Sequence, residues 1–236
     1  MTPLRRYVAE FLGTALLLAV VVGSGIMAER LAGGNLAMAL LANAIATGAG
    51  LIALILMFGT VSGAHFNPVV TLSEAWQKNL PKSDVLPYLL AQLVGAFAGV
   101  AAAHMMFGAP LFFASAHVRY GPAQWWSEFV ATFGLIGAVI GCSRSKPALT
   151  PFAVAAYITA AYWFTSSTSF ANPAVTLARA ASNTFVGIRP VDTPGFIIAQ
   201  FAGGLVATWL FCWLYPPAPP GASVAGTVSP SDFSES

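Results

Sequence analysis

The sequence predicts an all-α membrane protein in which six transmembrane helices and two re-entrant half-helices form an inverted repeat. Its 236 residues are 57% hydrophobic and only 8% charged, whereas a soluble domain carries about 25% charged residues. Apolar runs long enough to cross a bilayer recur along the chain, and a short stretch containing an Asn-Pro pair occurs twice. These observations make a lipid bilayer the expected surroundings of the chain.

Composition also excludes several classes of function. The net charge of +2 is small and the basic residues are scattered, so no nucleic acid is expected as a partner. Catalytic elbows, phosphate loops and metal-ligand spacings are missing from the sequence, which predicts no enzyme activity, no cofactor and no metal. Cys142 and Cys212 lie in or beside apolar runs and are expected to be unpaired packing thiols.

Six apolar runs reach spanning length, at residues 7–28, 36–59, 85–107, 123–142, 150–167 and 195–215. The first run follows Arg5 and Arg6, as in a secretory signal peptide. It has about the 20 residues that a bilayer span needs, and it carries Glu10, which favours a retained helix. Two further apolar segments, 67–78 and 172–182, are too short to cross and are predicted to be half-helices.

Each half-helix begins with a similar motif, Asn67-Pro68-Val69 in the first and Asn172-Pro173-Ala174 in the second. Asn is a preferred N-cap, and Pro is favoured at the first helical position because its missing N–H would be unpaired there. A helix that begins within a membrane leaves backbone N–H groups that lipid cannot satisfy. We therefore expect both motifs to line a polar path through the bilayer.

The second half of the sequence repeats the first. Residues 9–14 resemble 127–132, the Asn-Pro motifs follow in each half, and residues 88–95 resemble 196–203. Because each copy holds three spans, an odd number, the second copy must be inverted in the membrane. The predicted division is a first repeat (1–107), a connecting loop (108–122), a second repeat (123–215) and a disordered tail (216–236).

Basic residues give the expected orientation. Six lie on the side of the two termini and four on the other side, a weak bias that favours cytoplasmic termini. The plasma membrane of a bacterium, its inner membrane, is the expected location.

Five polar residues lie inside apolar segments, and four of them occupy equivalent places in the two halves. We interpret Glu10 and Glu128 as braces that accept N–H groups of the re-entrant backbone, with proton carriage as the alternative. Gln92 and Gln200 are expected to bond between helices. His65, beside the first motif, is interpreted as a structural group.

The paired Asn-Pro motifs, the inverted halves and the Ala9-Glu10-Phe11 opening resemble the aquaporin family of major intrinsic proteins. The resemblance extends to about Trp213. It implies the aquaporin fold, a homotetramer with one pore per subunit, and a single-file path for small neutral solutes. Asn67 and Asn172 would donate hydrogen bonds at the centre of that path.

The selectivity filter implied by this resemblance lacks its usual arginine. The four filter positions transferred by sequence offset are Thr47, Ala160, Ser169 and Val175. All four are small and uncharged, and Val175 stands where the family usually has Arg, which predicts a wide constriction. Arg179, one helical turn beyond, is interpreted either as overhanging the outer vestibule or as an ordinary interfacial charge.

A filter of this kind resembles that of bacterial aquaglyceroporins associated with arsenic resistance. The resemblance implies passive conduction of glycerol-like polyols, water, arsenite and methylarsenicals. An ordinary water or glycerol facilitator is the alternative within the channel class. A proton-coupled secondary transporter that uses Glu10 and Glu128 is the alternative outside it.

Overall fold

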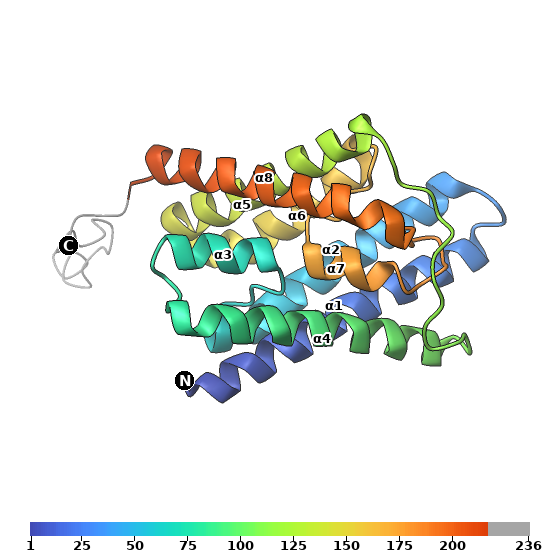
Figure 1. Cartoon of the computed structure of the whole chain (residues 1–236), viewed down its shortest axis with the longest axis horizontal. Helices are drawn as coiled ribbons and strands as arrows, with labels where there is room; N and C mark the ends of the chain where they lie inside the picture. The colour runs from blue at the N-terminus through green and yellow to red at the C-terminus, as the bar shows by residue number, and fades with distance from the viewer. Residues whose placement is uncertain (217–236) are drawn as a thin grey trace, which may run out of the picture.

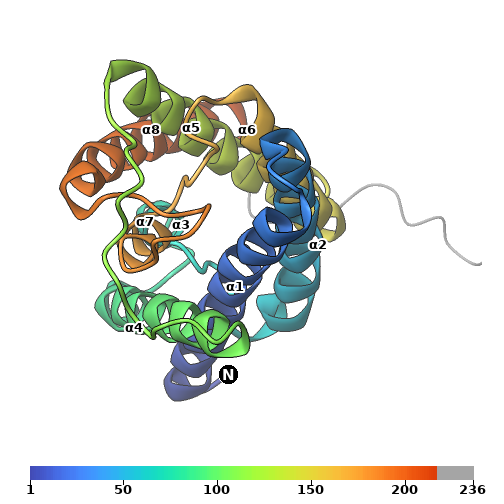
Figure 2. The same cartoon turned by 90° about the vertical axis from the view of Figure 1, so that its right-hand side faces the viewer.

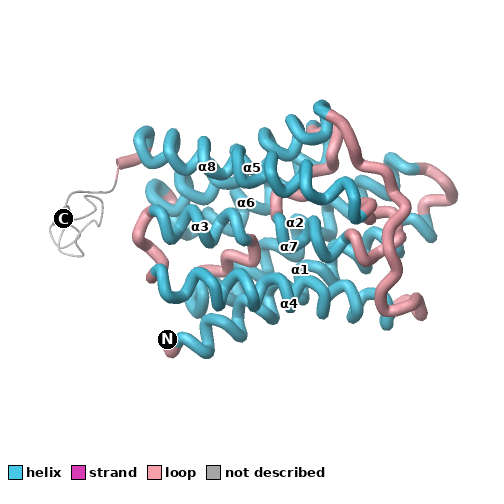
Figure 3. Tube along the Cα trace, in the orientation of Figure 1, coloured by secondary structure: helices cyan, strands magenta, loops and turns pink. Residues whose placement is uncertain are grey.

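The computed structural model describes residues 1–216, so the tail predicted at 216–236 lies outside the described residues except for its first position. Those residues form helices joined by loops, with no strand among them (Figure 3). The helices are α1 (Pro3–Leu31), α2 (Leu36–Ser62), α3 (Pro68–Trp76), α4 (Lys82–Met106), α5 (Pro122–Ser145), α6 (Thr150–Phe164), α7 (Pro173–Arg179) and α8 (Thr193–Leu214). Two short 3₁₀ helices precede α6 and α8, at Pro147–Leu149 and Pro190–Asp192.

Within residues 1–216, five helices are long and apolar enough to cross a membrane: α1, α2, α4, α5 and α8, the last together with its preceding turn. The sixth predicted span, 150–167, corresponds to α6, which has 15 residues and a length of about 22 Å. The prediction placed its end too late. The chain leaves the helix at Thr165, whose backbone is extended, and a polar Ser/Thr stretch follows.

The half-helices α3 and α7 lie end to end along the long axis of the molecule (Figure 1). Viewed along that axis, they overlap in one column, with the six longer helices around them (Figure 2). Their Asn-capped ends meet near the middle, and α3 and α7 run from there toward opposite faces. The described chain begins and ends on the face toward which α3 runs (Figure 1).

Helix packing follows the repeat. The α1–α4 pair of the first half corresponds to the α5–α8 pair of the second, while α2 packs against α6 across the halves. Gly95 of α4 lies against the backbone carbonyl of Phe11, and Gly203 of α8 lies against that of Phe129. A Cβ at either glycine would overlap these carbonyls, so small residues set the close approach of both pairs.

A long loop between α4 and α5 crosses the face toward which α7 runs (Figure 1). It is anchored beside the C-terminal end of α7, where the N–H groups of Phe113 and Ser115 donate to the carbonyls of Ala181 and Ala180 (3.1 and 2.9 Å). The loop therefore forms part of the surroundings of α7 at this face.

Candidate functional site

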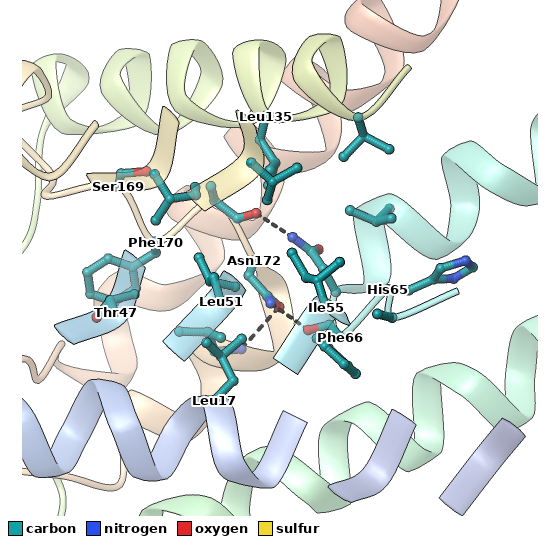
Figure 4. A pocket seen from close by; sticks show the side chains of 18 of the residues that line it. Leu17, Thr47, Leu51, Ile55, His65, Phe66, Leu135, Ser169, Phe170 and Asn172 are labelled. Atoms are coloured by element: carbon teal, nitrogen blue, oxygen red, sulfur yellow. Dashed lines mark hydrogen bonds between the residues drawn. The ribbon is translucent and has the colours of Figure 1, made fainter. Parts of the chain in front are cut away.

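The two asparagines join the half-helices reciprocally. Asn67 Oδ1 accepts from the N–H of Val69 (2.9 Å), and its Nδ2 donates to the carbonyl of Ala171 (2.7 Å). Asn172 Oδ1 accepts from the N–H of Ala174 (3.0 Å), and its Nδ2 donates to the carbonyl of Phe66 (2.7 Å). Figure 4 shows such bonds at Asn172 and Phe66. Each amide keeps a second N–H that these contacts do not use.

The backbone before each asparagine is strained in the same way. Phe66 and Ala171, which directly precede the asparagines, have φ angles of 50° and 49°. Ala64 and Ser169, three residues before the asparagines, both have φ of 51°. The left-handed region costs a non-glycine residue about 1–2 kcal/mol, so other contacts must hold these turns.

Glu10 supplies those contacts in the first half. Its Oε1 accepts from Ser62 Oγ (2.6 Å) and the N–H of His65 (3.0 Å). Its Oε2 accepts from the N–H of Phe66 and from Gln92 Nε2 (both 2.8 Å). The side chain is completely buried, and all four donors converge on one carboxyl group.

Glu128 occupies the equivalent place in the second half. It accepts from the N–H groups of Phe170 and Ala171 (both 2.8 Å) and from Gln200 Nε2 (2.6 Å). Gln200 also donates to Thr176 Oγ1 (2.8 Å), as Gln92 does to Thr71 in the first half (2.8 Å). His65 Nδ1 lies 3.1 Å from the same Thr71 hydroxyl.

A cavity of about 240 Å³ passes the junction of the half-helices. Asn67, Asn172 and His65 line it, and the rest of its wall is mainly aliphatic, as Leu17 and Leu51 in Figure 4 illustrate. The arrangement can offer a hydroxylated solute a few hydrogen-bond donors on an otherwise apolar wall.

Three of the four filter positions predicted by offset, Thr47, Ser169 and Val175, line this cavity together. Ala160 does not line it: it is exposed on α6, and its assignment to the filter is corrected here. Tyr162 lines the cavity instead, and its hydroxyl lies 3.2 Å from Thr47 Oγ1. Two positions along a helix turn the side chain by about 200°, which explains why a small error in the offset selects the opposite face.

A charged side chain, Arg179, also borders the cavity beside these uncharged positions. Arg179 does not overhang the surface. It is 1% exposed, and its guanidinium carbon lies 3.3 Å from the centre of the Phe170 ring. Phe170 lines the cavity as well (Figure 4). The charge therefore lies within the wall, one helical turn beyond Val175.

Two further charged residues at or near the cavity, Glu74 and Arg119, are not predicted from the sequence. Glu74 borders the cavity and stands seven residues after Asn67, just as Arg179 stands seven after Asn172. An alignment of the two repeats on their asparagines would therefore have indicated Glu74 as a cavity residue. Arg119 lies in the α4–α5 loop and has no counterpart in the first half. It donates to the carbonyls of Gly187 (2.7 Å) and Ser167 (3.1 Å), contacts that only the folded chain creates.

No group of three or more His, Cys, Asp or Glu side chains that could hold a metal ion occurs in residues 1–216. Cys142 and Cys212 are both free thiols.

Comparison with known proteins identifies the family. The family model for "Major intrinsic protein" matches residues 1–166. The aquaglyceroporin AqpS of Rhizobium meliloti (strain 1021) is 55% identical over 216 residues, which cover 92% of each chain. Glycerol uptake facilitator protein-like 6 of Lactiplantibacillus plantarum is 33% identical over 99 residues, 42% of each chain.

Solved structures agree on the fold. The X-ray structure of the aquaglyceroporin from Plasmodium falciparum matches with a TM-score of 0.66 and 18% identity, over 89% of this chain and 96% of that one. The six longer helices, the two half-helices and the cavity between them have the arrangement expected of an aquaporin fold. The chain is thus a multi-pass integral membrane channel and not an enzyme, and it belongs to the major intrinsic protein family.

Proposed function

We propose that this channel conducts small neutral hydroxylated solutes passively: glycerol-like polyols, water, arsenite (as uncharged arsenous acid) and methylarsenicals. The observation that carries the proposal is the pair of asparagine amides in a mainly aliphatic cavity, with Val175 in the wall. Hydroxyl oxygens can accept from Asn67 and Asn172, while the carbon face of a polyol contacts the aliphatic wall. The names of AqpS and of the Lactiplantibacillus protein support solutes of this size.

Electrostatics at the junction favours neutral solutes. Each half-helix presents its N-terminal end to the junction, and a helix N-terminus carries a partial positive charge of up to about half an elementary charge. A cation that loses its water there gains no compensating acceptor, so ions are disfavoured.

The constriction in this proposal consists of Thr47, Tyr162, Ser169 and Val175. Tyr162 makes it narrower on the α6 side than the ring deduced from sequence, and its hydroxyl adds a polar group beside Thr47. Val175 leaves open the volume that a longer side chain would fill. Arsenous acid fits the same site because it has the hydroxyl geometry and neutrality of a small polyol.

The proposal also covers the boundaries of the repeats, the residues that brace the backbone, the oligomeric state and the orientation in the membrane. We assign residues 1–107 and 123–215 to the two repeats, 108–122 to their connection, and the roles of backbone braces to Glu10, Glu128, Gln92, Gln200 and His65. A homotetramer in the bacterial inner membrane with cytoplasmic termini completes the proposal. Exposed leucines on α1, among them Leu12 and Leu16, suit contact with lipid or with neighbouring subunits.

The contacts favour bracing over proton carriage for the two glutamates. Glu10 accepts four hydrogen bonds, and Glu128 accepts three. Such contacts stabilise the ionised carboxylate. A proton carrier must instead exchange its proton during each cycle.

Stopped-flow light scattering on proteoliposomes tests the proposal with water, glycerol, urea and arsenite, each with and without a pH gradient. A channel gives solute flux that rises linearly with concentration and is insensitive to the gradient. Saturable, gradient-driven flux would support a transporter, and flux at the level of empty vesicles would refute conduction altogether.

A further inference from the structure

Two ionisable side chains border the cavity at equivalent positions of the repeat but with opposite charge. Glu74 of α3 and Arg179 of α7 each stand seven residues after the capping asparagine. Because α3 and α7 run apart from their junction (Figure 1), these residues lie toward opposite ends of the cavity. The cavity wall therefore carries a basic side chain toward the α7 end and an acidic side chain toward the α3 end.

The guanidinium of Arg179 is held in position, but not all of its N–H groups make hydrogen bonds. It stacks on Phe170, and Nε donates to the carbonyl of Val186 (2.5 Å). Within residues 1–216, its terminal nitrogens make no hydrogen bond and are not among the buried unpaired polar atoms. Since the side chain borders the cavity, these N–H groups are available to whatever passes through it.

Arg179 forms no ion pair in the described part of the chain, where the ion pairs are Arg6–Asp84 and Arg189–Asp192. The carboxyl group at the same turn is that of Glu128, which accepts from the N–H of Phe170. The nearest cation reinforces the charge of Arg179, because the guanidinium carbon of Arg119 lies 5.0 Å from the same Phe170 ring. Arg119 donates to loop carbonyls and does not line the cavity, so of the two arginines Arg179 is the one that borders the lumen.

We infer that Arg179 is a specificity-determining residue that excludes cations at the α7 end of the channel. A hydroxylated neutral solute can accept from the free guanidinium N–H groups. A cation in the same place meets the positive charges of Arg179 and Arg119, which outnumber the one carboxyl group at this turn, Glu128, in a site of reduced dielectric constant. The inference rests on the channel function and assigns one residue to the separation of neutral solutes from cations.

The test measures glycerol flux and potassium leak in the same proteoliposomes. Wild-type protein is expected to conduct glycerol while it retains potassium. Arg179→Gln is expected to raise potassium leak by about tenfold or more with little change in glycerol flux, and Arg179→Lys to restore retention. Glu74→Gln is the matched control: it removes the opposite charge from the equivalent position and should not raise potassium leak.

Arg179→Met provides a second neutral variant in case the glutamine variant does not fold, because its side chain still packs on Phe170. The inference is overturned if either neutral variant conducts glycerol and retains potassium as wild type does. It is also overturned if wild-type protein conducts glycerol and releases potassium at a comparable rate, or if Glu74→Gln leaks potassium as much as the Arg179 variants. Absence of glycerol flux in wild type would instead refute the proposed function.

Discussion

Replacing Glu10 by glutamine should destabilise the protein more than the same change at Glu128. Glutamine keeps the size of the side chain but turns one oxygen into an NH₂ donor. At Glu10 each oxygen accepts one hydrogen bond from a backbone N–H and one from a side chain, Ser62 or Gln92, so either orientation of the amide places NH₂ against a fixed backbone donor and forces a side-chain partner to reorient. At Glu128 one oxygen accepts only from the N–H of Phe170, so the amide can turn its NH₂ group toward a single donor.

The magnitudes follow from these contacts. A hydrogen bond to a charged group contributes about 1.5–3 kcal/mol and a neutral one about 0.5–1.5 kcal/mol, so Glu128→Gln should cost about 1.5–3 kcal/mol, and Glu10→Gln, which also disturbs Ser62 or Gln92, about 2–4.5 kcal/mol. Because a neutral amide is easier to bury than a carboxylate, the lower ends of these ranges are expected. At roughly 2–4 °C per kcal/mol for a chain of this size, the Tm of Glu10→Gln should fall by roughly 4 °C or more.

Thermal unfolding of the purified protein in detergent measures this difference, and Glu29→Gln, an exposed position on the same helix, is the control. If the glutamates are braces, Glu29→Gln should have the highest Tm, Glu128→Gln a lower one and Glu10→Gln the lowest. A proton carrier predicts otherwise, since glutamine mimics the protonated carboxyl group: Tm would be preserved and pH-coupled flux would be lost. Equal Tm values for the three variants would refute the bracing argument.

Three further predictions concern the cavity wall and its surroundings. Val175→Arg should reduce glycerol and arsenite flux far more than water flux in stopped-flow assays, because the longer side chain fills the constriction; equal loss for all three solutes would contradict the filter assignment. Ala160→Phe should leave glycerol flux unchanged, because this side chain lies on the outer face of α6, and a strong reduction would return Ala160 to the filter. Partial burial and the charges of Arg119 and Arg179 hold the pKa of the His117 imidazole below its usual 6.5, so Arg179→Gln should raise that pKa in an NMR titration, whereas an unchanged pKa would place the guanidinium charge elsewhere.

Sequence reasoning succeeded where local chemistry dictates structure. An Asn-Pro pair inside apolar sequence specifies a capped helix start at Asn67 and again at Asn172, and the structure begins α3 and α7 there. The repeat also placed Glu10 and Glu128 in equivalent positions, and each carboxyl group lies beside the turn of its own half.

Sequence reasoning failed where the direction of a side chain around its helix, or a contact with a distant part of the chain, decides where a residue lies. The offset to Ala160 counts residues back across the Ser/Thr stretch that ends α6, and an error of two positions reverses the direction of the side chain. Arg119 is buried among loop carbonyls that lie about 50–70 residues away in the sequence, and no local pattern indicates such partners. Arg179 stands out in the sequence one helical turn beyond Val175, but its stacking on Phe170 depends on a strained loop that sequence does not specify.

The reciprocal asparagine bonds have a consequence for the chain as a whole. The carbonyl before each asparagine accepts its hydrogen bond from the asparagine of the other half. A polypeptide cut between α4 and α5 would therefore yield two fragments that each bury an unsatisfied turn. Co-production of the fragments should rescue both, and neither should accumulate alone, because each half supplies the hydrogen-bond donor that the turn of the other half needs.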